Sequence, residues 1–185
     1  YQSKRMDIYK KYIQQLLDED KAYYCYMSRD ELDALREEQM ANKQTPKYNN
    51  TWRPEEGKEL PAIPEGVEPV VRIKSPQSGI ISFIDGVKSI MNFDSSEVDD
   101  FIIARSGGVP TYNFVVAIDD ALMGVNEVVR GDDHLSNTPK QIVVYNALGF
   151  DIPKFYHVPM ILNPSGKKLS KRDGAMDVME YKKDG

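Results

Sequence analysis

The sequence is poor in the residue types that build disulfide-linked and thiolate–metal proteins. Its 185 residues include one cysteine, Cys25, and two histidines, His134 and His157. A single cysteine excludes an internal disulfide and a zinc site made of several thiolates. This cysteine usage suits a reducing compartment, and we expect a cytoplasmic protein without zinc.

Long apolar runs are also missing. No stretch approaches the ~18 to 20 apolar residues that span a bilayer, and we expect no secretory signal and no membrane partner. The net charge of −5 argues against a protein that coats nucleic acid indiscriminately, so a site for an anion must be local.

What the sequence does contain is enough apolar material for a core. Its 41% hydrophobic and 10% aromatic content predicts a globular protein. The first residue is not Met, and a helical pattern begins almost at once, with one apolar face made of Tyr9, Tyr12, Ile13, Leu16 and Leu17. We therefore expect this chain to be an internal fragment of a longer protein.

A second helix and a long connection follow. Ser28 and Glu31 have the spacing of a capping box, and Leu32, Leu35 and Met40 continue the helix. Residues 41–69 are rich in Pro, Asn, Gly and charge, which predicts a long surface connection.

The next segments predict strands and then an α/β arrangement. PVVRIKSP, GIISFID, VKSIMNF and DFIIARSGG are short, β-branched and separated by turn residues, which favours an antiparallel group over crossovers. TYNFVVAIDDALMG and VNEVVRGDD read as strands or strand-to-helix units. Thr138 and Pro139 begin a helix that Gly149 ends.

The segment VVRGDDHLSNTP follows an apolar strand, where open α/β sheets bind ligands. Its polar residues have two other readings. Ser136, Asn137 and Thr138 can simply cap the next helix, and Asp132, Asp133 and His134 are poorly spaced to bind one metal ion because adjacent side chains seldom converge.

Two single residues also have ordinary structural interpretations. His157, in FYHVPMIL, is expected to be a strand histidine. Tyr112 offers a hydroxyl group, but a tyrosine in an apolar run is usually a core residue with one hydrogen bond.

A cluster of cations stands out in this acidic chain. NPSGKKLSKRDGA contains Lys167, Lys168, Lys171 and Arg172 in a Pro/Gly region, where no helix face would solvate them. The segment is not a nucleotide-binding P-loop, because it lacks the first Gly of G-x-x-x-x-G-K-[ST]. The ordinary alternative is a solvated lysine run.

Taken in order, GVPTYNFVVAIDDALMGVNEVVRGDDHLSNTPKQ and FYHVPMILNPSGKKLSKRDGA closely resemble bacterial glutamyl-tRNA synthetases, which are class I aminoacyl-tRNA synthetases. KLSKR is similar to the family's mobile ATP-binding signature KMSKS, with Leu169 in place of Met and Arg172 in place of the last Ser. The resemblance extends from YQSKRMDIY to the last residue.

The resemblance implies an α/β fold, namely part of a Rossmann-like catalytic domain with an inserted α+β domain that binds the tRNA acceptor end. The implied ranges are 1–6 for the end of the first catalytic half, 7–110 for the insertion, 111–149 for the second half and 150–185 for the KMSKS-loop region.

It also implies ATP-dependent activation of glutamate and its transfer to the 3′ end of tRNA(Glu). The implied partners are ATP with Mg²⁺, L-glutamate and tRNA(Glu), and the implied protein is a monomer. By position, Lys168 and Lys171 would be catalytic. The glutamate pocket would include Tyr112, Val116 and Arg130, and the ATP site Asp133, Lys168, Leu169, Ser170, Lys171 and Arg172.

These assignments are chemically reasonable. Activation joins a carboxylate to the α-phosphate of ATP, so the site must hold anions together and stabilise developing charge. The planar guanidinium of Arg130 suits two-point recognition of a carboxylate, and Tyr112 can donate a hydrogen bond beside it.

One departure from the family leaves alternatives open. The other ATP signature, HIGH, is absent, because the two histidines lie in different motifs. We therefore expect the chain to be inactive alone. One alternative is a glutamyl transferase paralogue acting on a modified tRNA base, although KLSKR lacks the degeneration expected there. Another is a noncatalytic RNA-binding module, which has no need of an ATP loop.

Overall fold

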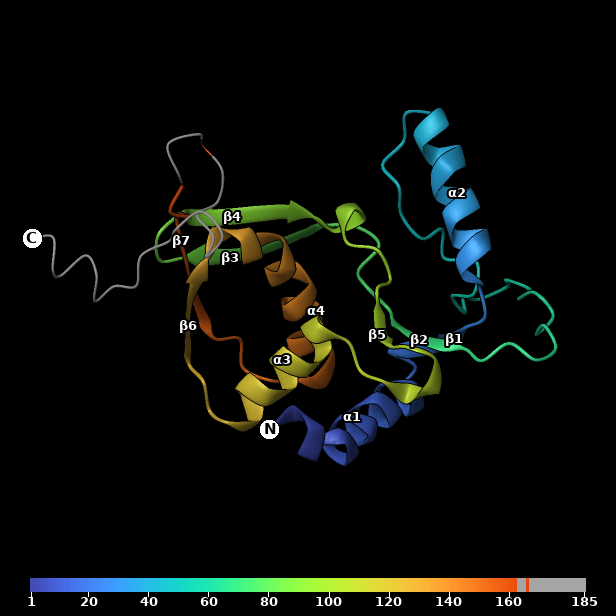
Figure 1. The fold of residues 1–185 in the computed structure, drawn as a ribbon, viewed down its shortest axis with the longest axis horizontal. Coiled ribbons are helices and arrows are strands. Elements are labelled where there is room, and N and C mark those ends of the chain that lie inside the picture. Colours follow the sequence, from blue (N-terminus) through green and yellow to red (C-terminus); the bar gives the residue numbers. More distant parts are fainter. Residues whose placement is uncertain (163–165, 167–185) are drawn as a thin grey trace, which may run out of the picture.

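The computed structural model describes residues 1–162 and Gly166. They form two sheets and a set of helices (Figure 1). The segment from Lys168 to Arg172 lies outside these residues. The helices are α1 (Met6–Asp18), α2 (Arg29–Ala41), α3 (Tyr112–Leu122) and α4 (Thr138–Leu148), with the 3₁₀ turns η1 (Gln2–Lys4), η2 (Ser95–Glu97), η3 (Ser106–Gly108) and η4 (Asp132–Asn137).

The strands belong to two sheets. The order β1-β2-β5 makes an antiparallel sheet, and the order β4-β3-β7-β6 makes a mixed sheet in which β7 runs parallel to both β3 and β6. The strands are β1 (Ala22–Cys25), β2 (Val70–Ile73), β3 (Ile80–Asp85), β4 (Ser89–Asp94), β5 (Ile102–Ala104), β6 (Glu127–Gly131) and β7 (Lys154–Val158).

The expectation of one antiparallel group is therefore wrong in part. The pairs β2–β5 and β3–β4 are antiparallel, as expected, but they lie in different sheets and β3 also has a parallel neighbour, β7. An alternating apolar pattern predicts a strand with one buried face. It does not say which distant strand will pair with the free edge.

Several local predictions are confirmed. The Ser28 hydroxyl accepts a hydrogen bond from the Glu31 backbone N–H at 3.2 Å, and the Glu31 carboxylate accepts from the Ser28 N–H at 2.7 Å, which completes the capping box of α2. Gly149 ends α4 at φ 70°, in the left-handed region that a helix end commonly uses. Residues 42–69 form a long connection without helix or strand.

The segment beginning at Tyr112 is a helix over its whole length, not a strand. Helix α3 buries Phe114, Val115, Ala117 and Ile118, which is consistent with 3.6 residues per turn rather than alternation. Tyr112 is its first residue and is 52% exposed. The expectation that Tyr112 is a core residue is therefore wrong.

One apolar core runs from α1 through both sheets. It includes Tyr9 of α1, Ile73 of β2, Ile118 of α3 and Phe155 of β7. Helix α1 is fastened to α3 by Asp119, which accepts hydrogen bonds from Arg5 Nε and the Tyr9 hydroxyl, both at 2.8 Å. The predicted range 7–110 thus shares its core with the residues that follow it, and the ranges themselves stay a prediction.

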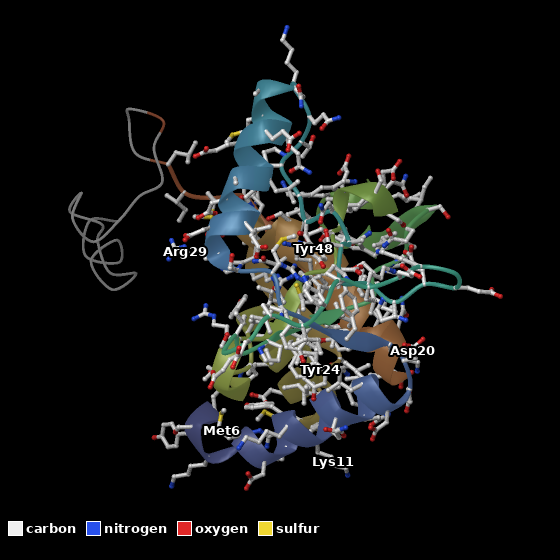
Figure 2. The ribbon with its side chains drawn as sticks, turned by 90° about the vertical axis from the view of Figure 1, so that its right-hand side faces the viewer. Met6, Lys11, Asp20, Tyr24, Arg29 and Tyr48 are labelled. Atoms are coloured by element: carbon white, nitrogen blue, oxygen red, sulfur yellow. The ribbon has the colours of Figure 1, made fainter. Side chains whose placement is uncertain are left out.

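A second, smaller cluster lies near the base of α2. Tyr23, Cys25, Tyr48 and Trp52 are buried together there, and Figure 2 shows Tyr48 between the helix and the rest of the molecule. Cys25 Sγ lies 3.6 Å from the Tyr48 hydroxyl. Cys25 is therefore a core residue.

The mixed sheet curves around α3 and α4 (Figure 1). Its other face is open: Ile80, Ile84 and Val129 are 67 to 76% exposed. Among residues 1–162, no helix is both long and apolar enough to cross a membrane.

Candidate functional site

A row of three polar side chains crosses the core face of the mixed sheet, one from each of β3, β7 and β6. Arg130 is paired with His157 in the β6–β7 ladder, and Asp85 is paired with Phe155 in the β3–β7 ladder. Because side chains alternate along a strand, Phe155 and His157 share a face. The register therefore brings Asp85, His157 and Arg130 together near the carboxyl ends of these parallel strands.

The row is a chain of hydrogen bonds. His157 Nδ1 lies 2.5 Å from Asp85 Oδ2, and Arg130 Nε donates to His157 Nε2 at 3.0 Å. A guanidinium nitrogen can only donate, so Nε2 must accept and the ring proton must lie on Nδ1, facing Asp85. His157 is thus held as one neutral tautomer. Both His157 and Asp85 are buried.

Arg130 has a second anchor in α4. Its Nη2 donates to the hydroxyl of Thr138 at 2.8 Å, and that hydroxyl lies 3.1 Å from His157 Nε2. The guanidinium carbon also lies 5.3 Å from the centre of the Phe155 ring. These contacts fix the guanidinium through groups that carry no charge.

Because its partners in residues 1–162 are neutral, the positive charge of Arg130 is not balanced there by a direct ion pair. Within the described part of the chain it forms no salt bridge with a carboxylate. Burial lowers the pKa of Arg130, while nearby Tyr112 and Asp120 raise it. Burial also raises the pKa of Asp120, against the effect of Arg130. A partly buried guanidinium without a carboxylate partner is a good receptor for an anionic ligand.

The carboxylate at the other end of the row is firmly ionised. Burial acts to raise the pKa of Asp85, but hydrogen bonds from the His157 ring and from the backbone N–H groups of Lys88, Val87 and His157 outweigh it and bring the pKa to about 2. Asp85 therefore remains an acceptor for His157 at neutral pH.

The other expected glutamate-site residues lie on α3. Tyr112 begins the helix, and Val116 follows one turn later, half-buried. The Tyr112 and His134 rings are 6.2 Å apart. Just inside, Asn113 accepts a hydrogen bond from Gln141 Nε2 at 3.2 Å. The exposed Tyr112 also lies close enough to Arg130 to raise the pKa of its guanidinium.

The acidic pair after β6 is divided between two roles. Asp132 forms a salt bridge with Lys88 at 2.9 Å, which joins η4 to the β3–β4 turn. Asp133 is exposed, and its carboxylate lies against Gly131, where an added Cβ would be 2.6 Å from Asp133 Oδ1 and 2.9 Å from Met160 Sδ. Gly131 therefore lets Asp133 approach the backbone closely.

No metal centre is evident in residues 1–162, where no three His, Cys, Asp or Glu side chains are placed to hold an ion. His134 Nδ1 instead contacts the Asn137 amide at 3.2 Å. The absence of zinc from the protein stays a prediction.

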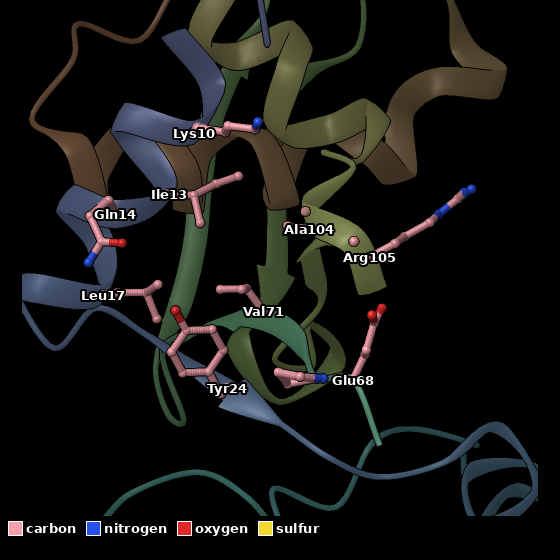
Figure 3. Close-up of a pocket in the computed structure, with 12 residues that line it drawn as sticks. Lys10, Ile13, Gln14, Leu17, Tyr24, Glu68, Val71, Ala104 and Arg105 are labelled. Carbon is pink, nitrogen blue, oxygen red and sulfur yellow. The ribbon is translucent and has the colours of Figure 1, made fainter. Parts of the chain in front are cut away.

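A separate cleft of about 470 Å³ lies between α1 and the three-stranded sheet, where Lys10, Tyr24 and Arg105 line it (Figure 3). Of the described residues expected to bind glutamate or ATP, namely Tyr112, Val116, Arg130 and Asp133, none lines this cleft. The described part of the expected site is instead the Arg130 region of the mixed sheet.

Sequence reasoning missed three residues that contact Arg130 or its anchor: His157, Thr138 and Asp85. His157 is a strand histidine, as expected, but its partners were not foreseen. Thr138 does begin α4, yet its hydroxyl contacts Arg130. The contacts depend on the parallel pairing of distant strands, for which the sequence holds no local signal.

The parallel strands β3, β7 and β6, with α3 and α4 beside their sheet, have the arrangement of a Rossmann-like domain, and Arg130 lies near the strand ends where such sheets bind ligands. The sequence model of the family "tRNA synthetases class I (E and Q), catalytic domain" matches residues 1–185. The chain belongs to this family.

Individual relatives agree with the family match. The chain is 73% identical over 185 residues to glutamate–tRNA ligase 1 of Aliarcobacter butzleri and 70% identical over 182 residues to glutamate–tRNA ligase 1 of Sulfurovum sp.. The two matches include 100% and 98% of this chain, which spans 39% and 38% of the length of the two relatives.

Solved structures give the same result. A glutamate–tRNA ligase from Elizabethkingia meningosepticum, crystallised with its amino acid, superposes with a TM-score of 0.81 at 36% identity, over 94% of this chain and 36% of that one. The enzyme from Elizabethkingia anophelis superposes with a TM-score of 0.80, also at 36% identity, over 94% of this chain and 37% of that one.

Proposed function

We propose that the protein containing this chain is a glutamate–tRNA ligase, which activates L-glutamate with ATP and transfers it to the 3′ end of tRNA(Glu). This proposal also takes the protein to be a cytoplasmic monomer. The observation that carries it is Arg130, a guanidinium fixed by the neutral acceptors His157 and Thr138 and placed beside Tyr112.

Arg130 receives a carboxylate of glutamate in this proposal. Its Nε and one N–H of Nη2 face the protein, so the rest of the guanidinium is left for the ligand. The exposed Tyr112 hydroxyl donates a further hydrogen bond, and Val116 supplies apolar surface on the same helix face. A fixed cation of this kind orients glutamate without a large entropic cost on binding.

ATP, with its Mg²⁺, is the second substrate in this proposal. Asp133 takes part from η4, and Lys168, Leu169, Ser170, Lys171 and Arg172 provide the KMSKS-type loop. Lysines that approach the triphosphate stabilise the charge that moves toward pyrophosphate in the transition state. These loop roles rest on the motif KLSKR in the sequence.

The test is a charging assay with the full-length protein, ATP, Mg²⁺ and unfractionated bacterial tRNA. We expect labelled glutamate to become acid-precipitable on tRNA in an ester linkage that mild base hydrolyses, with no incorporation of aspartate. Incorporation into tRNA whose 3′-terminal adenosine has been removed would instead favour transfer to a modified base. Binding of tRNA without any incorporation would favour the noncatalytic alternative.

A further inference from the structure

Asp85 and His157 lie behind Arg130, away from the ligand side. The row begins at a buried carboxylate, passes through one imidazole and ends at the guanidinium. A carboxylate in direct contact with Arg130 would neutralise it. With an imidazole between them, Asp85 orients the guanidinium without a direct salt bridge.

We propose that Asp85 and His157 are positioning residues for Arg130, and that Asp85 acts by fixing the tautomer of His157. This inference rests on the proposed function, since the ligand of Arg130 is taken to be glutamate. Neither residue touches the substrate. Their effect is to keep His157 Nε2 as an acceptor, so that Arg130 has one orientation before glutamate arrives.

Asp85 determines which nitrogen of His157 carries the ring proton, and its replacement by Asn should change that. Asp85 also accepts hydrogen bonds from the backbone N–H groups of Val87 and Lys88, at 3.0 and 2.9 Å. In Asp85→Asn, the amide oxygen can keep these two bonds while the amide NH₂ faces His157 Nδ1. Nδ1 must then accept, the ring proton moves to Nε2, and two donors face each other between His157 and Arg130.

Two substitutions of His157 distinguish the role of Nδ1, which donates to Asp85, from that of Nε2, which accepts from Arg130. The amide nitrogen of Asn lies close to the position of Nδ1, and the amide oxygen of Gln lies close to that of Nε2. His157→Asn thus keeps a donor for Asp85 but loses the acceptor for Arg130. His157→Gln keeps the acceptor for Arg130 and loses the donor, which leaves Asp85 with its backbone partners.

The experiment measures KM for glutamate and for ATP in charging assays on the full-length protein and its variants. We expect Asp85→Asn and His157→Asn to raise the glutamate KM about tenfold or more, the value of a charge-assisted hydrogen bond, with little change in the ATP KM. The glutamate KM of His157→Gln should be much closer to the wild-type value than that of His157→Asn. Asp94→Asn, at the end of the neighbouring strand β4, is the matched control.

A second measurement does not depend on activity. Nitrogen NMR of protein labelled in histidine and arginine reports which ring nitrogen of His157 is protonated and how fast the Arg130 Nε proton exchanges. We expect a protonated Nδ1 and a protected Nε–H in the wild type, with the proton on Nε2 and faster exchange in Asp85→Asn.

The outcomes separate the two proposals. One outcome is that the wild type fails to charge tRNA with glutamate and still shows a protonated His157 Nδ1 and a protected Arg130 Nε–H. In that case the proposed function is wrong, and the positioning of Arg130 by Asp85 and His157 is supported. If the wild type charges glutamate while Asp85→Asn and both His157 variants keep its glutamate KM, the positioning role is wrong. Equal rises in both KM values together with a lower melting temperature would also overturn it, because they indicate general damage.

Discussion

At the scale of single residues, the guanidinium of Arg130 meets two neutral acceptors in different directions, and an ammonium group cannot copy that arrangement. In the full-length protein we expect Arg130→Lys to lower kcat/KM for glutamate roughly tenfold to hundredfold, although the positive charge is retained. The check is the glutamate KM and kcat in charging assays. Arg29→Lys, at a side chain that is 92% exposed, is the control, and unchanged constants in Arg130→Lys would defeat the assignment.

The lysines of KKLSKR allow a comparison within one short segment. We expect Lys171→Ala to reduce kcat about hundredfold at saturating ATP, in line with the loss of one group that stabilises a transition-state charge. Lys168→Ala should also reduce it, and Lys167→Ala, just outside the motif, should have little effect. Normal turnover in all three variants would mean that the cluster is a solvated lysine run.

Asp85 also gives a pH dependence of stability. Its folded pKa of about 2 lies below the ordinary value of 3.8, so its contribution is complete above pH 4 and disappears as the pH falls toward 2. The difference corresponds to about 2 kcal/mol. Urea unfolding of the chain at pH 4, 3 and 2 should show a shallower loss of stability in Asp85→Asn. Parallel pH curves for the two proteins would contradict this.

At the scale of elements, α2 depends on its cap because it has no buried residue of its own. Replacement of Ser28 by Ala removes a hydrogen bond worth about 1 kcal/mol, which is roughly a fivefold change in the open population. We expect amide hydrogen exchange to become that much faster across α2 only. Ser82→Ala, in the β3–β4 hairpin, should leave α2 unchanged. Uniform acceleration in Ser28→Ala would mean that α2 opens only with the whole protein.

The elements also show how far sequence reasoning reaches. The capping box of α2, the end of α4 at Gly149 and the identity of most strands were predictable, because their signals are local. The expected cap of α4 from Ser136, Asn137 and Thr138 is wrong, since no side chain caps that helix. Helix α3 was not, since a continuous apolar run suits a strand or a buried helix equally. The anchors of Arg130 were out of reach for a different reason: their contacts require the registers of β3, β6 and β7, which tertiary packing decides.

At the scale of the whole molecule, the core links the predicted insertion to the second catalytic half, so the two should unfold together. Trp52 is the only tryptophan and lies buried in the cluster near α2, whereas Val144 of α4 lies in the main core. We expect Trp52 fluorescence and Val144 amide exchange to report the same denaturant midpoint. Two separate midpoints would show that the predicted ranges fold independently.

Phe114 is a suitable site for the perturbation, because its side chain is fully buried in the main core, which residues of both parts form. Phe114→Ala should lower the unfolding free energy by about 3 to 5 kcal/mol and shift both probes equally. Phe93→Ala, at a half-exposed position of β4, should cost less. A shift of only one probe would contradict a shared core.

The parallel pairing of β3 with β7 sets an order of events during synthesis on the ribosome. Asp85 pairs with Phe155, which lies 70 positions later in the chain. Phe155 follows Asp94, the last residue of the β3–β4 hairpin, by 61 positions, so at about 5 to 20 residues per second the hairpin waits roughly 3 to 12 s for its partner strand. Throughout this interval the free edge of β3 is unpaired, beside the apolar side chains of Ile80 and Ile84. An open edge of this kind attracts other strands, so slower translation between β4 and β7 lengthens the period in which a neighbouring nascent chain competes with β7.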